Sequence, residues 1–289
     1  AATATVADAG AAPPSTAELV VRAWRFTSSP EAEALLRRQE AWTAACMERA
    51  GFAYEAVVPP PARPEPDDPD YGLVDHFLSA GQDRRNAAIV DAFDPTAALA
   101  WRTALDGPPR SMDEERPATD DPARGGCAPV ALAALVGTQN ASAAGAVVGL
   151  ATELAAEARS DPAAMAARDE RVTCLRAAVS DLGPEELASG VEPFPVVRDW
   201  VAAAFPDLVD DPSAVRRLAE TDPAAATTVA ALHDRERALR AADRGCGDRR
   251  AEDAAIDAAL GDLADGSEWD VEQRRAADVA LDALEHGAG

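Results

Sequence analysis

The four cysteines and three histidines are the residues whose types most readily do chemistry. They are Cys46, Cys127, Cys174 and Cys246, with His76, His233 and His286. Thiolate and imidazole groups bind zinc when they recur at short, characteristic spacings. No Cys-x-x-Cys occurs in the chain, and no histidine lies at a ligand spacing from a cysteine. The sequence therefore predicts no metal site.

The cysteines instead favour disulfide bonds. They form two pairs of similar span, one in each half of the chain. Disulfides persist in oxidising compartments, so this pattern predicts an extracytoplasmic protein, either at the cell surface or secreted. The alternative is four buried thiols in a cytoplasmic protein. Four cysteines allow three connectivities, and their spacing does not choose among them.

The net charge limits the partners that the chain can have. It carries 51 acidic and 27 basic residues, a formal net charge of -24, and every basic residue is arginine. Nucleic acids and anionic lipid surfaces are bound by clustered positive charge. The arginine doublets are each embedded among acidic residues, which is typical of solvated helix faces. We therefore predict no nucleic-acid partner and no direct contact with an anionic membrane.

The chain lacks the short motifs of the common catalytic classes. Gly-x-Ser-x-Gly, His-Glu-x-x-His, a phosphate-binding loop and a dinucleotide fingerprint are absent, so no catalytic residue and no cofactor is predicted. Acidic residues between Asp67 and Asp75 miss the spacing, the glycine and the terminal glutamate of an EF-hand, and predict no calcium site. Carboxylate pairs for glycoside hydrolysis are recognised by their separation in space, so a hydrolase remains an open alternative.

Helix signals dominate the sequence. Ala is frequent, and Asp-Pro dipeptides recur where a capping carboxylate would precede a proline in the first helical turn. We predict helices over 30–50, 73–92, 95–106, 162–182, 194–206, 212–220, 223–244, 249–264 and 268–285. An uncharged segment, 128–152, has the length of a membrane span. Because Gly, Thr, Gln and Asn interrupt it at 137–140, we expect a buried helical segment that is broken at 137–141.

Cys46 is expected to face inward near the end of a helix. Trp42 and Cys46 share one helical face, and Gly51 is expected to stop the helix so that Phe52 and Tyr54 fold back. An inward thiol among apolar neighbours lacks the positive, exposed setting that activates a nucleophile. Cys46 is therefore interpreted as half of a disulfide.

Aromatic residues are concentrated in the first part of the chain. Nine of the thirteen precede residue 102, and none falls between 102 and 193. One interpretation is an aromatic core in the first half. The other is a concave binding site where aromatic faces meet the proline-rich loop at 57–72, since such loops often carry function. The candidate binding residues are Trp42, Phe52, Tyr54, Tyr71 and His76.

The predicted fold class is all-α, with two repeat-related helical units that are each closed by a disulfide. Each half has a helix with an inward cysteine, then shorter elements, then a second cysteine at the edge of another element. The units are expected over 19–158 and 159–289. Residues 1–18 are small and include two prolines, so they are expected to form a flexible tether.

Several motifs together resemble a known family. They are Trp42-x3-Cys46-Met47-x3-Gly51-Phe52-x-Tyr54, Tyr71-Gly72, Ala104-Leu105-x-Gly107, Gly125-Gly126-Cys127, Cys174-Leu175, and Arg235-Glu236-Arg237-Ala238-x4-Asp243-x2-Cys246. This framework resembles secreted actinobacterial lipoproteins of uncharacterised function, over roughly residues 20 to 275. Glu170 and Leu175 depart from it, because the pattern has Trp and Met at those positions.

The resemblance implies export, a lipid anchor at a cysteine upstream of residue 1, and the disulfides Cys46–Cys127 and Cys174–Cys246. It implies no reaction. The leading hypothesis is a surface-tethered binding or adaptor protein of the cell envelope that engages a partner protein or a cell-wall component. The alternatives are an envelope hydrolase acting on cell-wall polymer and a purely structural helical repeat protein. The sequence does not indicate an oligomeric state.

Overall fold

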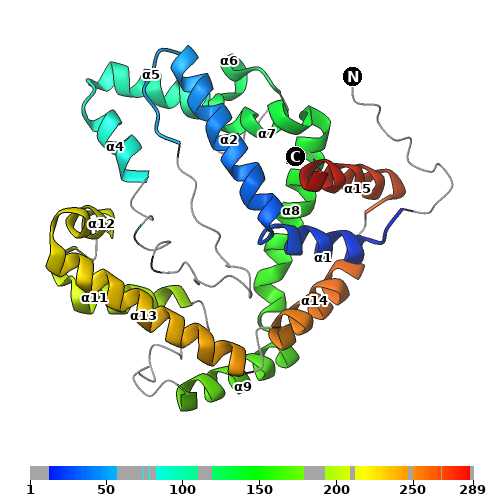
Figure 1. Cartoon of the computed structure of the whole chain (residues 1–289). Coiled ribbons are helices and arrows are strands. Elements are labelled where there is room, and N and C mark those ends of the chain that lie inside the picture. The colour runs from blue at the N-terminus through cyan, green and yellow to red at the C-terminus, as the bar shows by residue number, and fades with distance from the viewer. Residues whose placement is uncertain are drawn as a thin grey trace.

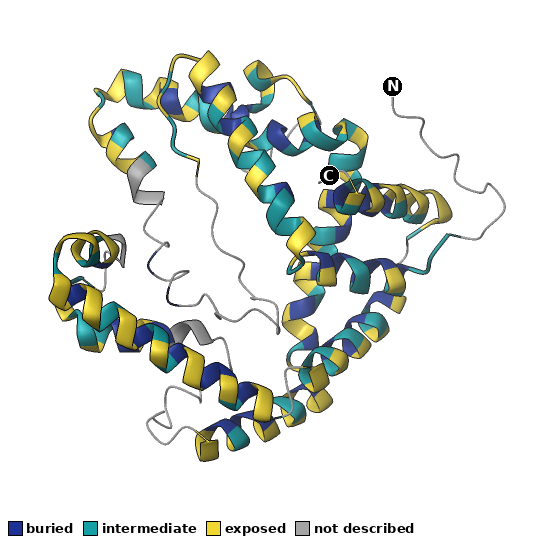
Figure 2. Ribbon diagram, viewed as in Figure 1, coloured by how far each residue is buried: buried dark blue, intermediate teal, exposed yellow. Residues whose placement is uncertain are grey.

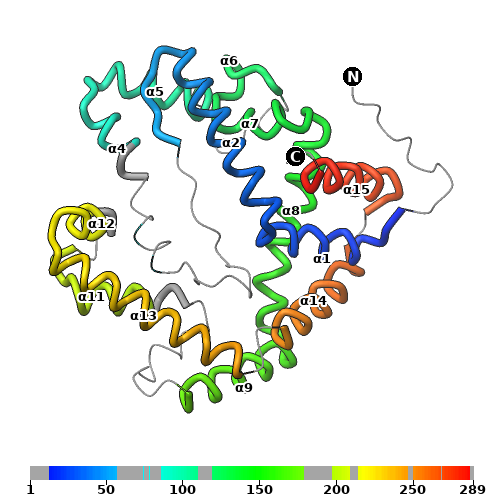
Figure 3. The backbone as a smooth tube through the Cα atoms, in the orientation of Figure 1, coloured from blue at the N-terminus to red at the C-terminus, as the bar shows by residue number. Residues whose placement is uncertain are grey.

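The computed structural model describes residues 13–56, 74, 78, 83–109, 119–178, 193–208, 212–246, 250–267 and 269–286. Every regular element in these ranges is helical, which confirms the all-α class (Figures 1 and 3). The elements are α1 (Thr16–Phe26), α2 (Pro30–Arg49), α4 (Asp83–Asp91), α5 (Pro95–Asp106), α6 (Pro122–Gly125), α7 (Cys127–Val136), α8 (Thr138–Ala158), α9 (Pro162–Ala178), α11 (Pro193–Ala204), the 3₁₀ turn η1 (Pro206–Leu208), α12 (Pro212–Thr221), α13 (Pro223–Gly245), α14 (Arg250–Asp265) and α15 (Val271–His286).

Four of the Asp-Pro dipeptides begin helices, as predicted. The capping carboxylates are Asp94, Asp121, Asp161 and Asp222, and each accepts a hydrogen bond from the backbone N–H two residues ahead, at 2.8 to 3.0 Å. Each cap satisfies an N–H that the first helical turn would otherwise leave without a partner. The proline that follows has no N–H to satisfy, so it fits the start of the helix.

The uncharged segment forms two helices, α7 and α8. They meet at Gly137, which has a φ of +88°, and their axes are bent by 108°. The predicted break is thus confirmed. One face of α8 is buried, and its members are Ala144, Val147, Ala151, Ala155 and Ala158. Within the described ranges no single helix is both long and apolar enough to cross a membrane, whereas the bent α7–α8 pair meets that criterion of length and composition jointly.

The largest hydrophobic cluster joins the two ends of the chain. α1 and the start of α2 pack with α8, α14 and α15, and the buried members include Leu19, Val147, Leu260 and Leu281 (Figures 1 and 2). The last two helices, which the prediction places in the second unit, therefore share a core with the first helix. The predicted repeat relation is not confirmed, and the limits 19–158 and 159–289 stay a prediction. α1 begins at Thr16, inside the range predicted as a tether.

Two smaller clusters complete the described core. One lies between α9, α11, α12 and α13, and Val74 and Leu78 from the first half of the chain also belong to it. The other contains Cys46, Met47, Val90, Trp101 and Cys127, from α2, α4, α5 and α7. Because α2 contributes Leu35 to the largest cluster and Cys46 to the smallest, this helix anchors the candidate site to the main core.

Candidate functional site

Three predicted binding residues lie together at the C-terminal end of α2. Gly51 has a φ of +86°, and the N–H of Phe52 donates to a carbonyl in the last turn of the helix at 2.9 Å. Beyond this turn, Phe52 and Tyr54 pack against the same small cluster as Trp42, and all three side chains are half-buried. We call these three residues, together with the buried Trp101, the aromatic platform.

Hydrogen bonds from α5 and α4 fix the backbone that carries the platform. The indole Nε1 of Trp101 donates to the carbonyl of Ala53 at 2.9 Å. The side chain of Asn86 accepts from the N–H of Glu55 and donates to its carbonyl, both at 2.9 Å. Ala53 and Glu55 lie in a segment without regular structure, but the carbonyl of Ala53 and both the N–H and the carbonyl of Glu55 are hydrogen-bonded. The side chains of this segment therefore have a defined orientation.

The tyrosine hydroxyl of the platform has a partner, and the side chains of Trp42, Phe52 and Tyr54 remain half-buried. The hydroxyl of Tyr54 donates to Oε2 of Glu40 at 2.9 Å, and its ring centroid lies 6.2 Å from that of Trp101. The guanidinium of Arg49 lies 5.9 Å from the ring centroid of Trp42, at cation–π distance. The arrangement offers apolar and aromatic surface beside a basic group and an acidic group, which suits recognition of another molecule.

A disulfide joins the platform to α7. Cys46 and Cys127 are bonded, and their Cα atoms are 5.7 Å apart. Both residues are buried, which agrees with the predicted inward position of Cys46. The pairing that the resemblance implies is therefore present, and it holds the C-terminal end of α2 against the start of α7.

Two glycines let the chain approach itself next to Cys127. A Cβ on Gly126 would lie 2.1 Å from the backbone nitrogen of Gly107, and one on Gly107 would lie 2.7 Å from the carbonyl oxygen of Gly125. Both Gly107 and Gly126 also have positive φ, of +87° and +83°. The Gly-Gly-Cys motif therefore has a steric cause, because only glycine allows α5 to end against the start of α7.

The substitution Gly126→Ala should destabilise the protein by about 2–3 kcal/mol, because the added Cβ collides with backbone atoms and the φ is unfavourable. Chemical denaturation of the oxidised protein measures this loss. Gly51→Ala is the matched control: its φ is also positive, but nothing lies within 4 Å of its Cβ position. We expect it to cost about 1 kcal/mol. Equal losses in the two variants would show that the close approach has no role.

The two remaining predicted residues, Tyr71 and His76, lie outside the described residues. The structure therefore brings together Trp42, Phe52 and Tyr54, and it adds Trp101, which the prediction did not include in the site. Trp101 could not be placed from the sequence, because its hydrogen bond to Ala53 joins residues 48 positions apart.

A second feature is a surface groove of about 810 Å³ between α1, the start of α2 and the end of α15. Apolar side chains such as Val21 and Phe26 line it together with charged ones such as Arg22, Glu18 and Glu285. Hydrogen bonds from the backbone N–H and then the hydroxyl of Ser15 lower the pKa of the Glu18 carboxyl. A general acid would need a raised carboxyl pKa, so Glu18 does not fit that role.

Arg22 ties α1 to α15 across this groove. It donates to Asp278 at 2.8 Å, to Glu285 at 2.9 and 2.7 Å, and also to Asp282. The hydrogen bond with Glu285, and then that with Asp282, raises the pKa of the Arg22 guanidinium despite its partial burial. The acidic residues recur at helical spacing in the sequence, but their arginine lies more than 250 positions away, so this cluster could not be predicted from local patterns.

The end of α15 also resembles a metal site. One ligand atom each from Asp282, Glu285 and His286 lie within 4.8 Å of one another. However, the guanidinium of Arg22 already bonds both carboxylates, and Nδ1 of His286 lies 3.0 Å from the carbonyl of Asp282. A metal ion would have to displace the cation that neutralises these groups. We therefore assign no metal to this cluster.

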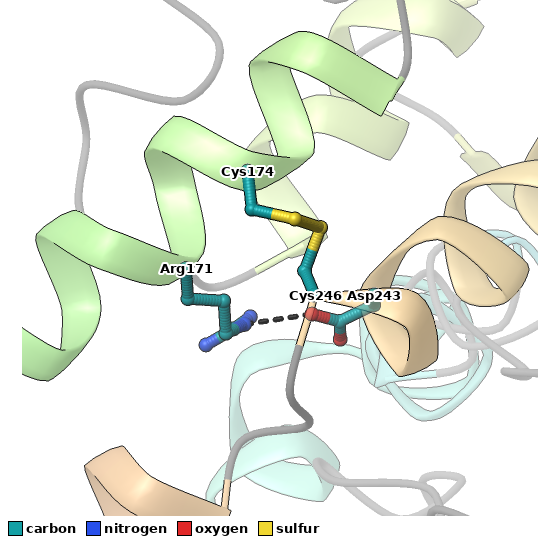
Figure 4. The surroundings of a disulfide bond; sticks show 4 residues. All are labelled: Arg171, Cys174, Asp243 and Cys246. Atoms are coloured by element: carbon teal, nitrogen blue, oxygen red, sulfur yellow. Dashed lines mark hydrogen bonds and ion pairs between the residues drawn. A yellow bond between two sulfur atoms is a disulfide. The ribbon is translucent and has the colours of Figure 1, made fainter.

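The second disulfide lies beside a buried network of charges. Cys174 on α9 is bonded to Cys246 at the end of α13, with Cα atoms 5.5 Å apart, which again is the pairing that the resemblance implies (Figure 4). Nε of Arg171 donates to Oδ1 of Asp243 at 2.7 Å. Arg171 also donates to Glu252 on α14 at 2.8 Å. Three helices thus meet at one buried arginine.

No protein-family model, curated protein or solved structure matches the chain.

Proposed function

We propose that this chain is an extracytoplasmic, surface-tethered binding or adaptor protein of the cell envelope, engaging a partner protein or a cell-wall component. The aromatic platform carries the proposal. Trp42, Phe52 and Tyr54 are half-buried against one hydrophobic cluster, which contains the Cys46–Cys127 disulfide, and the backbone of the turn is fixed by hydrogen bonds. In this proposal the protein is tethered by the lipid anchor that its resemblance to secreted actinobacterial lipoproteins implies.

Preorganised aromatic groups suit this function for an energetic reason. Aromatic side chains bury much apolar area with few rotatable bonds, so they lose little conformational entropy on binding. Trp, Tyr and Arg are also enriched among the residues that contribute most to interfaces. In this platform the backbone of the loop is held by Trp101 and Asn86, so ordering it on binding costs little.

The two disulfides support the location. Bridges of this kind form and persist outside the reducing cytoplasm. Both pairs are buried or partly buried between helices, so they belong to the folded framework. The acidic surface is compatible with a protein or wall partner and unfavourable for nucleic acid.

Capture from fractionated cell envelopes tests the proposal. The oxidised protein should retain a protein or a wall fragment, and Phe52→Ala should lower the retained amount at least about tenfold, because it removes a central aromatic contact. Leu99→Ala is the matched control, since Leu99 is 56% exposed on α5 but lies outside the platform; it should bind as the wild type does.

Three outcomes would contradict the proposal. The wild type could retain nothing under native conditions, or Phe52→Ala could bind as well as the wild type. In the third, the captured wall polymer would be cleaved during incubation, which would favour the hydrolase alternative. Circular dichroism of each variant, compared with the wild type, establishes that lost binding is not lost folding.

A further inference from the structure

An ion pair accompanies the second disulfide between the same two helices. Arg171 and Cys174 are one turn apart on α9, and Asp243 and Cys246 are one turn apart at the end of α13 (Figure 4). The Arg171–Asp243 pair and the Cys174–Cys246 bond each span 72 residues. The ion pair and the disulfide therefore join α9 and α13 at adjacent turns, and both links fit the same alignment of the two helices.

The ion pair is buried, and its burial determines how it affects the energy of the fold. The side chains of Arg171 and Asp243 are only 5% and 6% exposed. Removing two charges from water is costly, so a buried pair adds little net stability relative to apolar residues, whereas separating its members is strongly unfavourable. Such a pair therefore acts mainly by penalising arrangements in which its members do not meet.

The neighbouring residues penalise other registers of α9 and α13. Arg240 lies one turn before Asp243, so a slip of α13 by one turn would bring it towards Arg171 and place two guanidinium groups together. On α9, Arg168 lies one turn before Arg171, but it donates to Glu252 at 3.0 Å. The same carboxylate accepts from Arg171 at 2.8 Å, so α14 holds both arginines in their positions.

We propose that the Arg171–Asp243 ion pair is a register lock, which brings Cys174 and Cys246 together before they are oxidised. In the reduced chain the pair aligns α9 with α13, so that the two thiols face each other one turn away. The lock thereby selects one of the three connectivities that four cysteines allow.

The oxidation itself proceeds by thiol–disulfide exchange with a low-molecular-weight disulfide. One cysteine thiolate attacks the oxidant, releases one thiol and forms a mixed disulfide. The other thiolate then attacks the protein sulfur of that mixed disulfide and releases the second thiol. The two protein thiols lose their protons and two electrons, and the oxidant is reduced to two thiols. The lock acts on the second step, because only that step needs the two cysteines to meet.

Oxidative refolding of the full chain tests the lock. The reduced, unfolded protein is refolded in reduced and oxidised glutathione, quenched with acid, alkylated and digested, and each cross-linked peptide is quantified by mass spectrometry. In Arg171→Met/Asp243→Leu, Cys174–Cys246 should form about tenfold more slowly, and mispaired peptides should increase. Each mispaired bond within the chain uses Cys46 or Cys127, so the yield of Cys46–Cys127 should fall only by the amount of mispaired peptide. Unchanged rate and pairing at Cys174–Cys246 would overturn the proposal.

Two further variants separate the lock from a general effect of charge or folding. Arg168→Met removes an arginine from the same helix but leaves the Arg171–Asp243 pair, so it should oxidise at the wild-type rate. Arg171→Lys keeps a positive charge opposite Asp243 but loses the guanidinium that bonds Asp243 and Glu252 together, so its rate should lie between those of the wild type and the double variant. If Arg168→Met is as slow as the double variant, the pair is not the cause. Because the readout is a peptide cross-link, it does not depend on the yield of folded protein.

Discussion

Reducing both disulfides is expected to lower the melting temperature of this protein by roughly 15 °C. The bridges close loops of 81 and 72 residues, and constraint of the unfolded chain at that length stabilises the fold by about 4 kcal/mol per bridge. Together they are comparable to the net stability of a typical domain. Heating curves by far-UV circular dichroism, with and without a thiol reductant, measure the shift.

Paired alanine variants separate the two bridges. Cys46→Ala/Cys127→Ala and Cys174→Ala/Cys246→Ala should each lower the melting temperature by about half that amount. Only the first should also weaken capture, since only Cys46–Cys127 holds the aromatic platform. If thiol titration shows full reduction and the heating curve does not move, the bridges do not stabilise the fold.

Replacing Asp243 with leucine is expected to destabilise the protein by about 3–5 kcal/mol. The variant leaves Arg171 buried without its partner on α13, and the desolvation of its guanidinium is then only partly compensated by Glu252. The double variant Arg171→Met/Asp243→Leu removes both charges and should recover most of the loss. Urea denaturation of the oxidised proteins measures both values.

A less buried ion pair provides the matched control. Asp278→Leu removes one carboxylate from Arg22, but both side chains are about one-third exposed, and Asp282 and Glu285 remain as partners. We expect a cost below about 1 kcal/mol. Comparable losses for Asp243→Leu and Asp278→Leu would mean that burial does not decide the energy of these pairs.

The local elements could be predicted from the sequence because their signals are local. The carboxylates of Asp94 and Asp222 cap helices that follow them directly, and Gly137 breaks the uncharged segment where it was expected to. The face shared by Trp42 and Cys46 followed from helical spacing alone. These inferences needed no knowledge of contacts between distant parts of the chain.

The arrangement of the helices could not be predicted in the same way. The packing of α14 and α15 on α1 depends on contacts such as Arg22 with Asp278, between residues 256 positions apart. The close approach of Gly107 and Gly126 depends on how α5 meets α7. A repeat inferred from similar cysteine spacing takes no account of such contacts, and the shared core of the first and last helices does not confirm it.

Only the part of the candidate site that is local in the sequence could be predicted. The aromatic residues next to Cys46 were gathered by the end of one helix, so their types and spacing indicated them. Trp101 and Asn86, which hold their backbone, come from α5 and α4 and carry no signal for that role in the sequence. The register lock was equally hidden, although Asp243 belongs to the motif that resembles the lipoprotein family.

The state of the four cysteines in the cells that make this protein is the most direct test of the proposed oxidised, extracytoplasmic state. Thiols are alkylated at the moment of lysis, and the purified protein is digested without reduction and mapped by mass spectrometry. We expect the cross-linked peptides Cys46–Cys127 and Cys174–Cys246 and no alkylated cysteine. Four alkylated cysteines in the folded protein would contradict this, because they would indicate a reducing compartment and a framework that forms without disulfides.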